Sequence, residues 1–459
     1  PTHSQVASVF VRVLPKGGEL AFLKTIEPRH ADHGEMSAPP RRVTEVAVAE
    51  ADALISLPAG VLDDILARVG LRDAVRTSAL SRAWRRRWEA LPSLDLDSPR
   101  PRGDKGASKG LRAVDSVLLR CPGRVRRFYA YLDRLYAGRI DDWLLVFSRR
   151  GVEVFNLISV DGFLALPSAV FSCVSLTTLR LYGCAVPLLP TGFGGFLELR
   201  NLALINVRFQ EHGQYQLEEI IATSPLLKEL LLWDMEIAGD FTEWVIQAPN
   251  LRHLNIRSAE DLGWNIGELP CLHSAEIDIR DYLGDRDFAK FLAGFSSITK
   301  LVICTRHSPL NGANIVERFP CTFGKLKGLK LYTQFCELPS ILLTFCLLRN
   351  ASNLERLKIL IDDHADQKYE ANGEFQSAQL TDGMCANLQF VQITGIHWHS
   401  NEFSFIELIL SNARLLRTLS VSHGEKCSMS NEDAVSKLLK YTRASSHAEV
   451  LYEGKTKKQ

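Results

Sequence analysis

The sequence predicts an α/β fold in which three short helices precede an irregular solenoid, made of one parallel sheet with helical or irregular returns. Two observations lead to this prediction. An apolar stripe of helical period lies between Leu57 and Trp88. Downstream, a motif of the form L-x-x-L-x-L recurs at intervals from 21 residues (Leu251 to Leu272) to 34 residues (Leu354 to Leu388). Copies begin at Leu176, Leu199, Leu227, Leu251, Leu272, Ile298, Leu326, Leu354, Leu388 and Leu416, with an earlier copy at Val152.

The spacing of these copies is that of leucine-rich repeats. Each L-x-L segment predicts a short strand whose leucines point inward. Because one unit cannot bury its apolar edge alone, neighbouring units stack and their strands form one parallel sheet. Between strands, Gln216 to Pro225 places Leu217, Ile220 and Ile221 at helical spacing and ends at a proline, which predicts a return helix.

Composition excludes several classes of protein. The 459 residues include 54 Lys and Arg against 53 Asp and Glu, so no global charge favours a nucleic-acid partner. The longest apolar concentration, Ile341 to Leu348, is too short to span a membrane and predicts core. The first residues lack the pattern of a secretory signal. The ten cysteines form no CxxC pair, which favours a reducing compartment, cytoplasmic or nuclear, over secretion.

The helical stripe near the N-terminus predicts a small three-helix unit. Leu62, Ile65, Leu66 and Val69 lie on one side of a first helix between Pro58 and Gly70. Residues 72–81 predict a second helix, and residues 81–88 a third with Trp84 and Trp88 on one face. Three such helices are too few to close a robust core alone. Part of their apolar surface is therefore expected to meet a partner.

These segments resemble the plant proteins that join an F-box, leucine-rich repeats and a C-terminal FBD domain. The matching residues are Leu57-Pro58, the Ile65-Leu66 pair, residues 72–81, the two tryptophans and "PSLDLD" at 92–97. Residues 139–157, 166–184 and 444–452 resemble later blocks of the family, in the family order. Gly60 and Gly70 depart from it, standing where the family usually has an acid and a proline, which would loosen both ends of the first helix.

The resemblance implies a non-catalytic substrate-recognition subunit of an SCF-type ubiquitin ligase. Its F-box would bind a Skp-type adaptor, which connects it to cullin and RING subunits. A plain interaction scaffold and a small-molecule-dependent receptor stay open as alternatives. The residues expected to bind the adaptor are Leu57, Pro58, Val61, Leu62, Ile65, Leu66, Val69, Val75, Leu80, Trp84 and Trp88.

The repeats would hold the target protein on the concave face of the solenoid. In an L-x-L strand the intervening residue, and the residue just after the motif, point away from the core. This set is rich in Trp, Tyr and Arg, the usual anchors of protein interfaces. It comprises Arg180, Tyr182, Trp233, Asn255, Arg257, Glu276, Asp278, Arg280, Lys330, Tyr332 and Lys358.

No catalytic set, cofactor site or metal site is predicted. "TGFGG" at 191–195 lacks the Lys-Ser/Thr of a phosphate loop and predicts a turn. "HWH" at 397–399 would put two histidines on one strand face without further ligands. The acid-rich stretch 278–287 lacks the ordered Gly and distal Glu of a calcium-binding loop, and the stretch 361–367 follows a repeat strand and predicts a solvated loop. "RAWRRRW" at 82–88 could bind nucleic acid, but a solvated basic face explains the same letters better.

The predicted domains follow from these segments. Residues 1–50 form a leader, and translation would naturally begin at Met36. The F-box spans 51–97, a linker 98–114 and the repeats 115–380. An FBD-like unit at 381–454, with a helix over 403–413, would close the last open edge of the sheet, and 455–459 is a tail. Since the linker is polar and glycine-rich, few contacts are expected to cross it.

Overall fold

The computed structural model describes residues 58–80, 82, 84–97, 113–132, 138–239, 243–281, 288–304, 322–361, 373, 383–424, 427 and 429–453. These residues belong to one compact unit. The predicted leader, Met36 and Leu57 lie outside them, as do most of the acid-rich stretches 278–287 and 361–367.

A parallel sheet dominates the described residues and follows the order of the chain, each long strand pairing with the next. Its fourteen strands are β1 (Ser93–Asp97), β2 (Arg124–Leu132), β3 (Val154–Ser159), β5 (Thr178–Tyr182), β7 (Asn201–Ile205), β9 (Glu229–Trp233), β12 (His253–Glu260), β14 (Ser274–Asp281), β15 (Lys300–Cys304), β16 (Gly328–Thr333), β17 (Arg356–Ile361), β18 (Phe390–Ile396), β19 (Thr418–His423) and β20 (Glu449–Glu453). All eleven predicted motif copies form strands of this sheet, from β3 to β19, which confirms the repeat prediction.

The leucine spacing explains this sheet physically. In the copy that begins at Leu176, the side chains of Leu176, Leu179 and Leu181 are buried, whereas Arg180 between the last two is exposed. The strand register aligns Leu179 with Leu202 of the next strand, so the buried leucines form rows that run across the sheet. Each fully buried leucine contributes roughly 1.5–3 kcal/mol, which only stacking of neighbouring repeats can provide.

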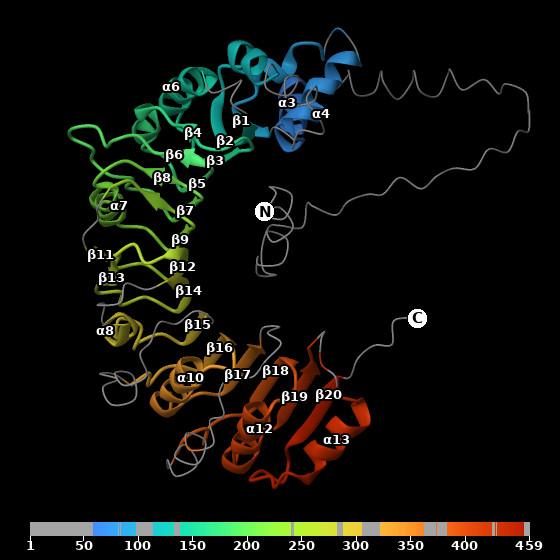
Figure 1. Ribbon diagram of the computed structural model, residues 1–459. Coiled ribbons are helices and arrows are strands. Elements are labelled where there is room, and N and C mark those ends of the chain that lie inside the picture. The colour runs from blue at the N-terminus through green and yellow to red at the C-terminus, as the bar shows by residue number, and fades with distance from the viewer. Residues whose placement is uncertain are drawn as a thin grey trace, which may run out of the picture. The chain divides into compact units, whose positions relative to one another are not determined.

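The returns are helical or irregular, as expected. Their helices include the six-residue α8 (Phe288–Ala293) and the longer α6 (Ile140–Arg150), α7 (Gly213–Ala222), α10 (Leu338–Asn350), α12 (Ser400–Asn412) and α13 (Asn431–Lys440). Figure 1 shows the sheet curving with α7, α8 and α10 on its outer side. The predicted helices at 216–225 and 403–413 correspond to α7 and α12, and the apolar run at 341–348 is buried in α10.

Short strands accompany some of these returns. β4 (Leu164–Ala165), β6 (Cys184–Ala185), β8 (Arg208–Phe209) and β10 (Glu236–Ile237) form a second small parallel sheet. β11 (Trp244–Ile246) and β13 (Trp264–Ile266) pair with each other. None of the helices described here is long and apolar enough to cross a membrane.

The N-terminal unit contains α3 (Ala59–Arg68) and α4 (Leu71–Arg76), followed by the 3-10 turns η1 (Thr77–Ala79) and η2 (Arg87–Ala90). The first two predicted helices are therefore confirmed. The third, at 81–88, is wrong as an α-helix. The amide of Arg87 bonds the carbonyl of Trp84, and that of Glu89 bonds the carbonyl of Arg86, three residues back in each case. These tighter turns still bring Trp84 and Trp88 into the core.

The expectation that few contacts cross the predicted linker is wrong. β1, which belongs to the predicted F-box, is the first strand of the main sheet and pairs in parallel with β2. The amide of Arg124 also bonds the carbonyl of Pro92 at 2.9 Å, and the Cys121 thiol bonds the carbonyl of Leu91 at 3.6 Å. The helical unit is therefore attached to the repeats by a shared sheet.

Candidate functional site

Helix α3 has a buried row and an exposed row of apolar side chains. Leu62 and Leu66 are 3% and 1% exposed, and α3 contacts η2, which carries the buried Trp88. These residues form the core of the small unit. Among the residues predicted to bind an adaptor, Leu62, Leu66, Trp84 and Trp88 are therefore internal and cannot contact a partner without unfolding.

The exposed row consists of Val61, Ile65 and Val69, which are 43%, 38% and 39% exposed. Because they are four residues apart, they line one side of the helix. Leu80, just after η1, is exposed by 64%, Pro58 is exposed and Val75 is half-buried. The structure thus leaves Val61, Ile65, Val69 and Leu80 open to solvent. We call the three valine and isoleucine side chains on α3 the α3 row.

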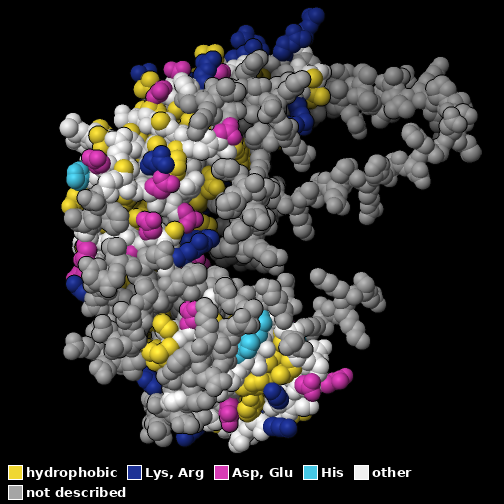
Figure 2. Space-filling view, in the orientation of Figure 1, with side chains coloured by type: hydrophobic (Ala, Val, Ile, Leu, Met, Phe, Trp, Pro, Cys, Tyr) yellow, Lys and Arg dark blue, Asp and Glu magenta, His cyan; other side chains and the backbone are white. Residues whose placement is uncertain are grey.

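The arginines of "RAWRRRW" contribute to the fold of this unit. Arg87 donates to the Asp63 carboxylate at 2.9 Å and to the Ala59 carbonyl at 3.3 Å, which ties η2 to α3. Arg86 pairs with Glu89 at 2.9 Å. Arg82 and Arg85 are exposed, and Figure 2 shows basic side chains gathered at this end of the unit. Two of the four cations are already paired within the chain, which favours a solvated basic face over a nucleic-acid site.

The second candidate site is the face of the main sheet that points away from the buried leucines, which we call the open face. Strand register places the predicted target-binding residues there in neighbouring rows. One row holds Arg180, Asn255, Glu276, Lys330 and Lys358; the next holds Tyr182, Trp233, Arg257, Asp278 and Tyr332; and Arg280 follows further along β14. The sequence prediction that these side chains share one face agrees with this register.

The middle of the open face is a polar network spread over three strands. The indole N–H of Trp233 donates to the Asn255 amide oxygen at 2.6 Å, and the Asn255 amide donates to the Glu276 carboxylate at 3.0 Å. Trp233 is only 6% exposed. Burial raises the pKa of Glu276, and the nearby charge of Lys330 opposes that rise. Trp233 therefore supports this network more than it offers an anchor to a partner.

Neighbouring charges on the open face also interact with one another. The guanidinium of Arg257 lies 3.8 Å from the Asp278 carboxylate and 5.9 Å from the centre of the Trp233 ring. Lys330 donates to the Tyr332 hydroxyl at 2.6 Å. Burial raises the pKa of the carboxyl group of Asp234, and the positive charge of Arg257 opposes the rise. Arg257 and Lys330, in the middle of the sheet, therefore already have partners within the chain.

The sequence analysis missed five apolar and aromatic residues on the open face: Tyr129, Tyr131, Ile158, Ile205 and Leu231. They are half-buried and lie on β2, β3, β7 and β9. β2 has no L-x-L motif, so the repeat search passed over it. Its segment "RVRRFYAYL" does alternate buried and more exposed residues, and that period-2 pattern could have identified the strand.

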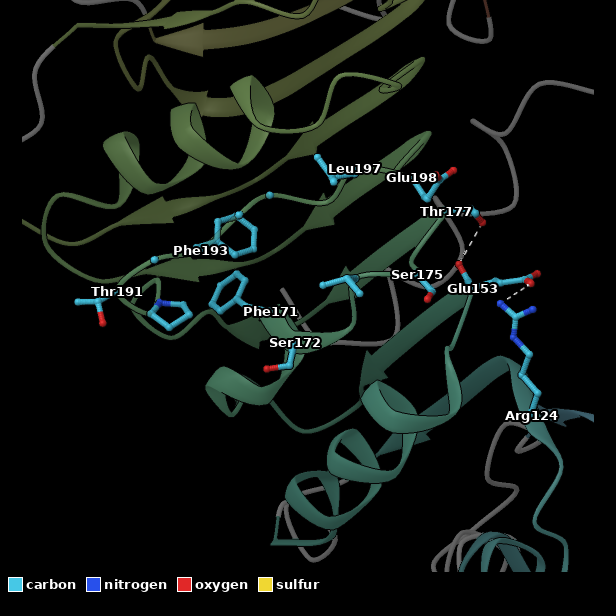
Figure 3. A pocket seen from close by; sticks show the side chains of 15 residues that line it. Arg124, Glu153, Phe171, Ser172, Ser175, Thr177, Thr191, Phe193, Leu197 and Glu198 are labelled. Carbon is cyan, nitrogen blue, oxygen red and sulfur yellow. Dashed lines mark hydrogen bonds and ion pairs between the residues drawn. The ribbon is translucent and has the colours of Figure 1, made fainter.

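A pocket of about 770 Å³ opens where several strands begin, and Figure 3 shows it from close by. Phe171 and Phe193 form an apolar wall, and their rings meet edge to face at 5.4 Å. Across from them, Arg124 pairs with Glu153 at 3.0 Å. The glycine-rich stretch 191–195 lines the pocket as a turn, with Gly192 and Gly195 at positive φ, as the sequence predicted.

"HWH" does not lie on a strand, so that prediction is wrong. β18 ends at Ile396, and His399 is the N-cap of α12. The Glu402 carboxylate accepts the backbone N–H groups of His397 and His399 at 3.0 and 2.9 Å, forming a capping box. Burial raises the pKa of Glu402 to about 7, and its hydrogen bond with the backbone of His399 opposes the rise. Within the described residues, no group of three or more His, Cys, Asp or Glu could hold a metal ion.

Comparisons with known proteins agree with this architecture. Residues 140–281 match the family model of the leucine-rich repeats of FBD-associated F-box protein At5g56370. F-box/FBD/LRR-repeat protein At1g13570 of Arabidopsis thaliana is 29% identical over 422 residues, covering 87% of this chain and 98% of the relative. FBD-associated F-box protein At5g60610 of the same plant is 23% identical, covering 81% of this chain and all of the relative.

A further relative, F-box/LRR-repeat protein 13 of Arabidopsis thaliana, is 24% identical, covering 88% of this chain and 96% of its own length. Among solved structures, an internalin from Listeria monocytogenes covers 68% of this chain and 82% of its own at a TM-score of 0.29 and 13% identity, too low to support an argument.

Proposed function

We propose that this chain, an α/β leucine-rich-repeat protein that resembles the F-box/FBD/LRR-repeat proteins of plants, is the substrate-recognition subunit of an SCF-type ubiquitin ligase. In this proposal the α3 row binds a Skp-type adaptor, which brings cullin and RING subunits. The open face of the repeats holds the target protein. The F-box names of the relatives support this role.

The observation that carries the proposal is the α3 row itself. Val61, Ile65 and Val69 are β-branched, apolar and side by side, yet they face solvent on a helix whose other apolar row already fills the core. Leu80 adds a fourth exposed side chain nearby in sequence. Burying such side chains against a partner releases roughly 25 cal/mol for every Å² of apolar surface removed from water. Covering this surface with a protein partner is therefore more favourable than leaving it exposed to water.

The contribution of such a subunit is proximity. It would hold a target lysine close to a ubiquitin carrier supplied by the other subunits, which raises the effective concentration of the two reacting groups. No residue of this chain needs to act on the bond that forms. The family model and the relatives named above carry F-box and leucine-rich-repeat descriptions, and none of those descriptions names a catalytic activity.

The α3 row can be tested by Ile65→Asp in the full chain, with affinity for a purified Skp-type adaptor as the readout. A carboxylate at the centre of an apolar interface should weaken binding by about a hundredfold, which corresponds to about 3 kcal/mol. Ala67→Asp is the matched control, because Ala67 is exposed on the same helix but points away from the row. It adds the same charge and should leave the affinity unchanged.

The buried Leu66 cannot serve this purpose, because an acid there would disrupt the core of the unit rather than its surface. Thermal melting of the Ile65→Asp variant should match that of the wild type. A variant that melts normally and still binds the adaptor with wild-type affinity would refute docking through α3. Adaptor binding that is absent even in the wild type would favour the interaction scaffold.

A further inference from the structure

The N-terminal part of the open face carries a continuous group of half-buried apolar and aromatic side chains. Register aligns Tyr131 of β2 with Ile158, Tyr182 and Ile205 on the next three strands. Tyr129 and Leu231 lie in the adjoining row. We call these six residues the aromatic patch: Tyr129, Tyr131, Ile158, Tyr182, Ile205 and Leu231. This inference rests on the proposed function, because it concerns the target that the open face would hold.

The patch is held in place before any partner binds. The hydroxyls of Tyr129 and Tyr131 are hydrogen-bonded at 2.8 Å, and their rings meet edge to face at 5.3 Å. β2, which carries both tyrosines, is paired with β1 on one side and β3 on the other, so its backbone is held in place as well. Tyrosine supplies a large contact area at a low cost in side-chain entropy, because only two torsions have to be fixed. Such a surface is suited to an apolar anchor of a partner.

Arg180 lies in the same row as Tyr129 and Leu231 and next to Tyr182 along β5. It is exposed, and among the described residues no carboxylate forms an ion pair with it. Burial raises the pKa of the Tyr129 hydroxyl, and the positive charge of Arg180 opposes that rise, so this charge acts on the patch. Asp97 and Asp234 also act on the patch, raising the pKa of Tyr129 and Tyr182 together with burial.

Two other cations of the open face differ in this respect. Arg257 has Asp278 beside it, and Lys330 donates to Tyr332. Arg180 therefore differs from Arg257 and Lys330 in combining an aromatic setting with a positive charge that has no ion pair or side-chain hydrogen bond among the described residues. A carboxylate placed against it would form a charge-assisted hydrogen bond in partly desolvated surroundings, where such bonds are strongest.

We propose that the aromatic patch and Arg180 together bind a segment of the target in which an apolar side chain adjoins an unmodified Asp or Glu. A single arginine fits one carboxylate. Recognition of a phosphate group typically uses a cluster of arginines, which the patch does not contain.

The test is selection from a library of random, unmodified peptides displayed against the purified full chain. The wild type should enrich peptides in which Leu, Ile, Phe or Tyr adjoins Asp or Glu. Arg180→Glu should reverse the charge preference, so that Lys or Arg replaces the acid. Lys358→Glu is the matched control, because Lys358 is exposed and belongs to the same row on β17. That variant should select the same peptides as the wild type.

Affinities of one selected peptide, measured by fluorescence anisotropy, complete the test. Arg180→Glu and Tyr182→Ser should each weaken binding at least tenfold, and Lys358→Glu less than twofold. Failure to enrich acidic peptides, an unchanged preference in Arg180→Glu, or tighter binding of a phosphoserine version than of the Asp or Glu version would overturn the proposal.

Adaptor affinity, measured on the same protein samples, separates this proposal from the proposed function. If the wild type selects peptides but does not bind the adaptor, the ligase role is wrong and the aromatic patch remains a peptide-binding site. Adaptor binding with no peptide preference would do the reverse.

Discussion

Helices α3 and α12 are both amphipathic, yet they use their apolar residues in opposite ways. In α12 the side chains of Phe405, Ile406, Leu408, Ile409 and Leu410 are all buried. In α3 only Leu62 and Leu66 are buried, and the α3 row stays exposed. α12 lies among the repeats, where it packs into a continuous core, whereas α3 belongs to the small unit that precedes β1.

This difference indicates which part of the chain has apolar surface left for another molecule to bind. The large apolar side chains of α12 named above are all covered by other parts of the same chain. The helical unit has more apolar surface than its own short elements can cover. Changes in α12 should therefore act on stability, and changes in the α3 row on binding. The predictions that follow test this contrast, beginning with the largest expected effect.

Removal of every residue from Thr381 onward should have the greatest effect. It deletes β18, α12, β19, α13 and β20, and it leaves β17 as an uncovered edge with its buried side chains open to solvent. We expect aggregation during expression, measured by size-exclusion chromatography. A chain that ends after β20 is the control and should stay soluble. A monomeric product of the shorter chain that melts cooperatively would contradict a role for these strands in closing the sheet.

Ile409→Ala in α12 should lower the free energy of unfolding by about 2–5 kcal/mol, because it opens a cavity in a fully buried site. Urea denaturation measures this change. Glu407→Ala, on the solvent side of the same helix, is the control and should change stability by less than about 0.5 kcal/mol. Equal effects of the two substitutions would show that α12 does not pack as described.

The buried Glu402 should make stability depend on pH. Its pKa is about 7 in the folded protein, against 4.5 for an ordinary glutamate, so the folded state binds more protons between these values. The contribution of protonated Glu402 to the free energy of unfolding is therefore fully present below pH 4.5. It is lost as the pH rises through 7, which lowers the free energy of unfolding by about 3 kcal/mol. Glu402→Gln keeps an acceptor oxygen but cannot ionise, so urea denaturation should show a smaller loss over this range. Identical pH profiles for the two proteins would rule this out.

Ile65→Ala should lower the free energy of unfolding by less than about 1 kcal/mol, because the Ile65 side chain is already partly in water. Leu66→Ala, one residue along the same helix, should cost about 2–5 kcal/mol. Urea denaturation of the two purified variants and the wild type measures both changes in the free energy of unfolding. If Ile65→Ala destabilises as much as Leu66→Ala, the α3 row belongs to the core and the contrast with α12 disappears.

The sequence predicted the repeats well because their signal is local. An apolar residue at a fixed offset, most often leucine, identifies a strand and the face it buries, and every copy from Val152 to Leu416 follows that rule. The strands without the motif escaped: β2 alternates Arg, Phe and Tyr instead of leucine, and β20 shows no fully buried side chain. β2 and β20 belong to the sheet because each pairs with a neighbouring strand, and the local pattern of a sequence does not predict such pairing.

The site was harder to predict than the fold. Leu62, Ile65, Leu66 and Val69 form one helical stripe in the sequence, and periodicity cannot tell which edge of a wide stripe faces the core. The contact between α3 and η2 points to the answer, since Leu62 and Leu66 of α3 and Trp88 of η2 are all buried. Similarly, the sequences around Arg180 and Arg257 do not distinguish these two arginines. The sheet register does, because it places Asp278 next to Arg257 and not next to Arg180.

Side-chain footprinting of the full chain, with and without a purified Skp-type adaptor, tests the central claim most directly. Carbene labelling reports how much of each side chain is open to solvent. The account predicts that the adaptor protects Val61, Ile65 and Val69, while labelling of Arg180 and Tyr182 on the open face stays the same. Unchanged labelling of the α3 row in the bound complex, or protection confined to the open face, would contradict it.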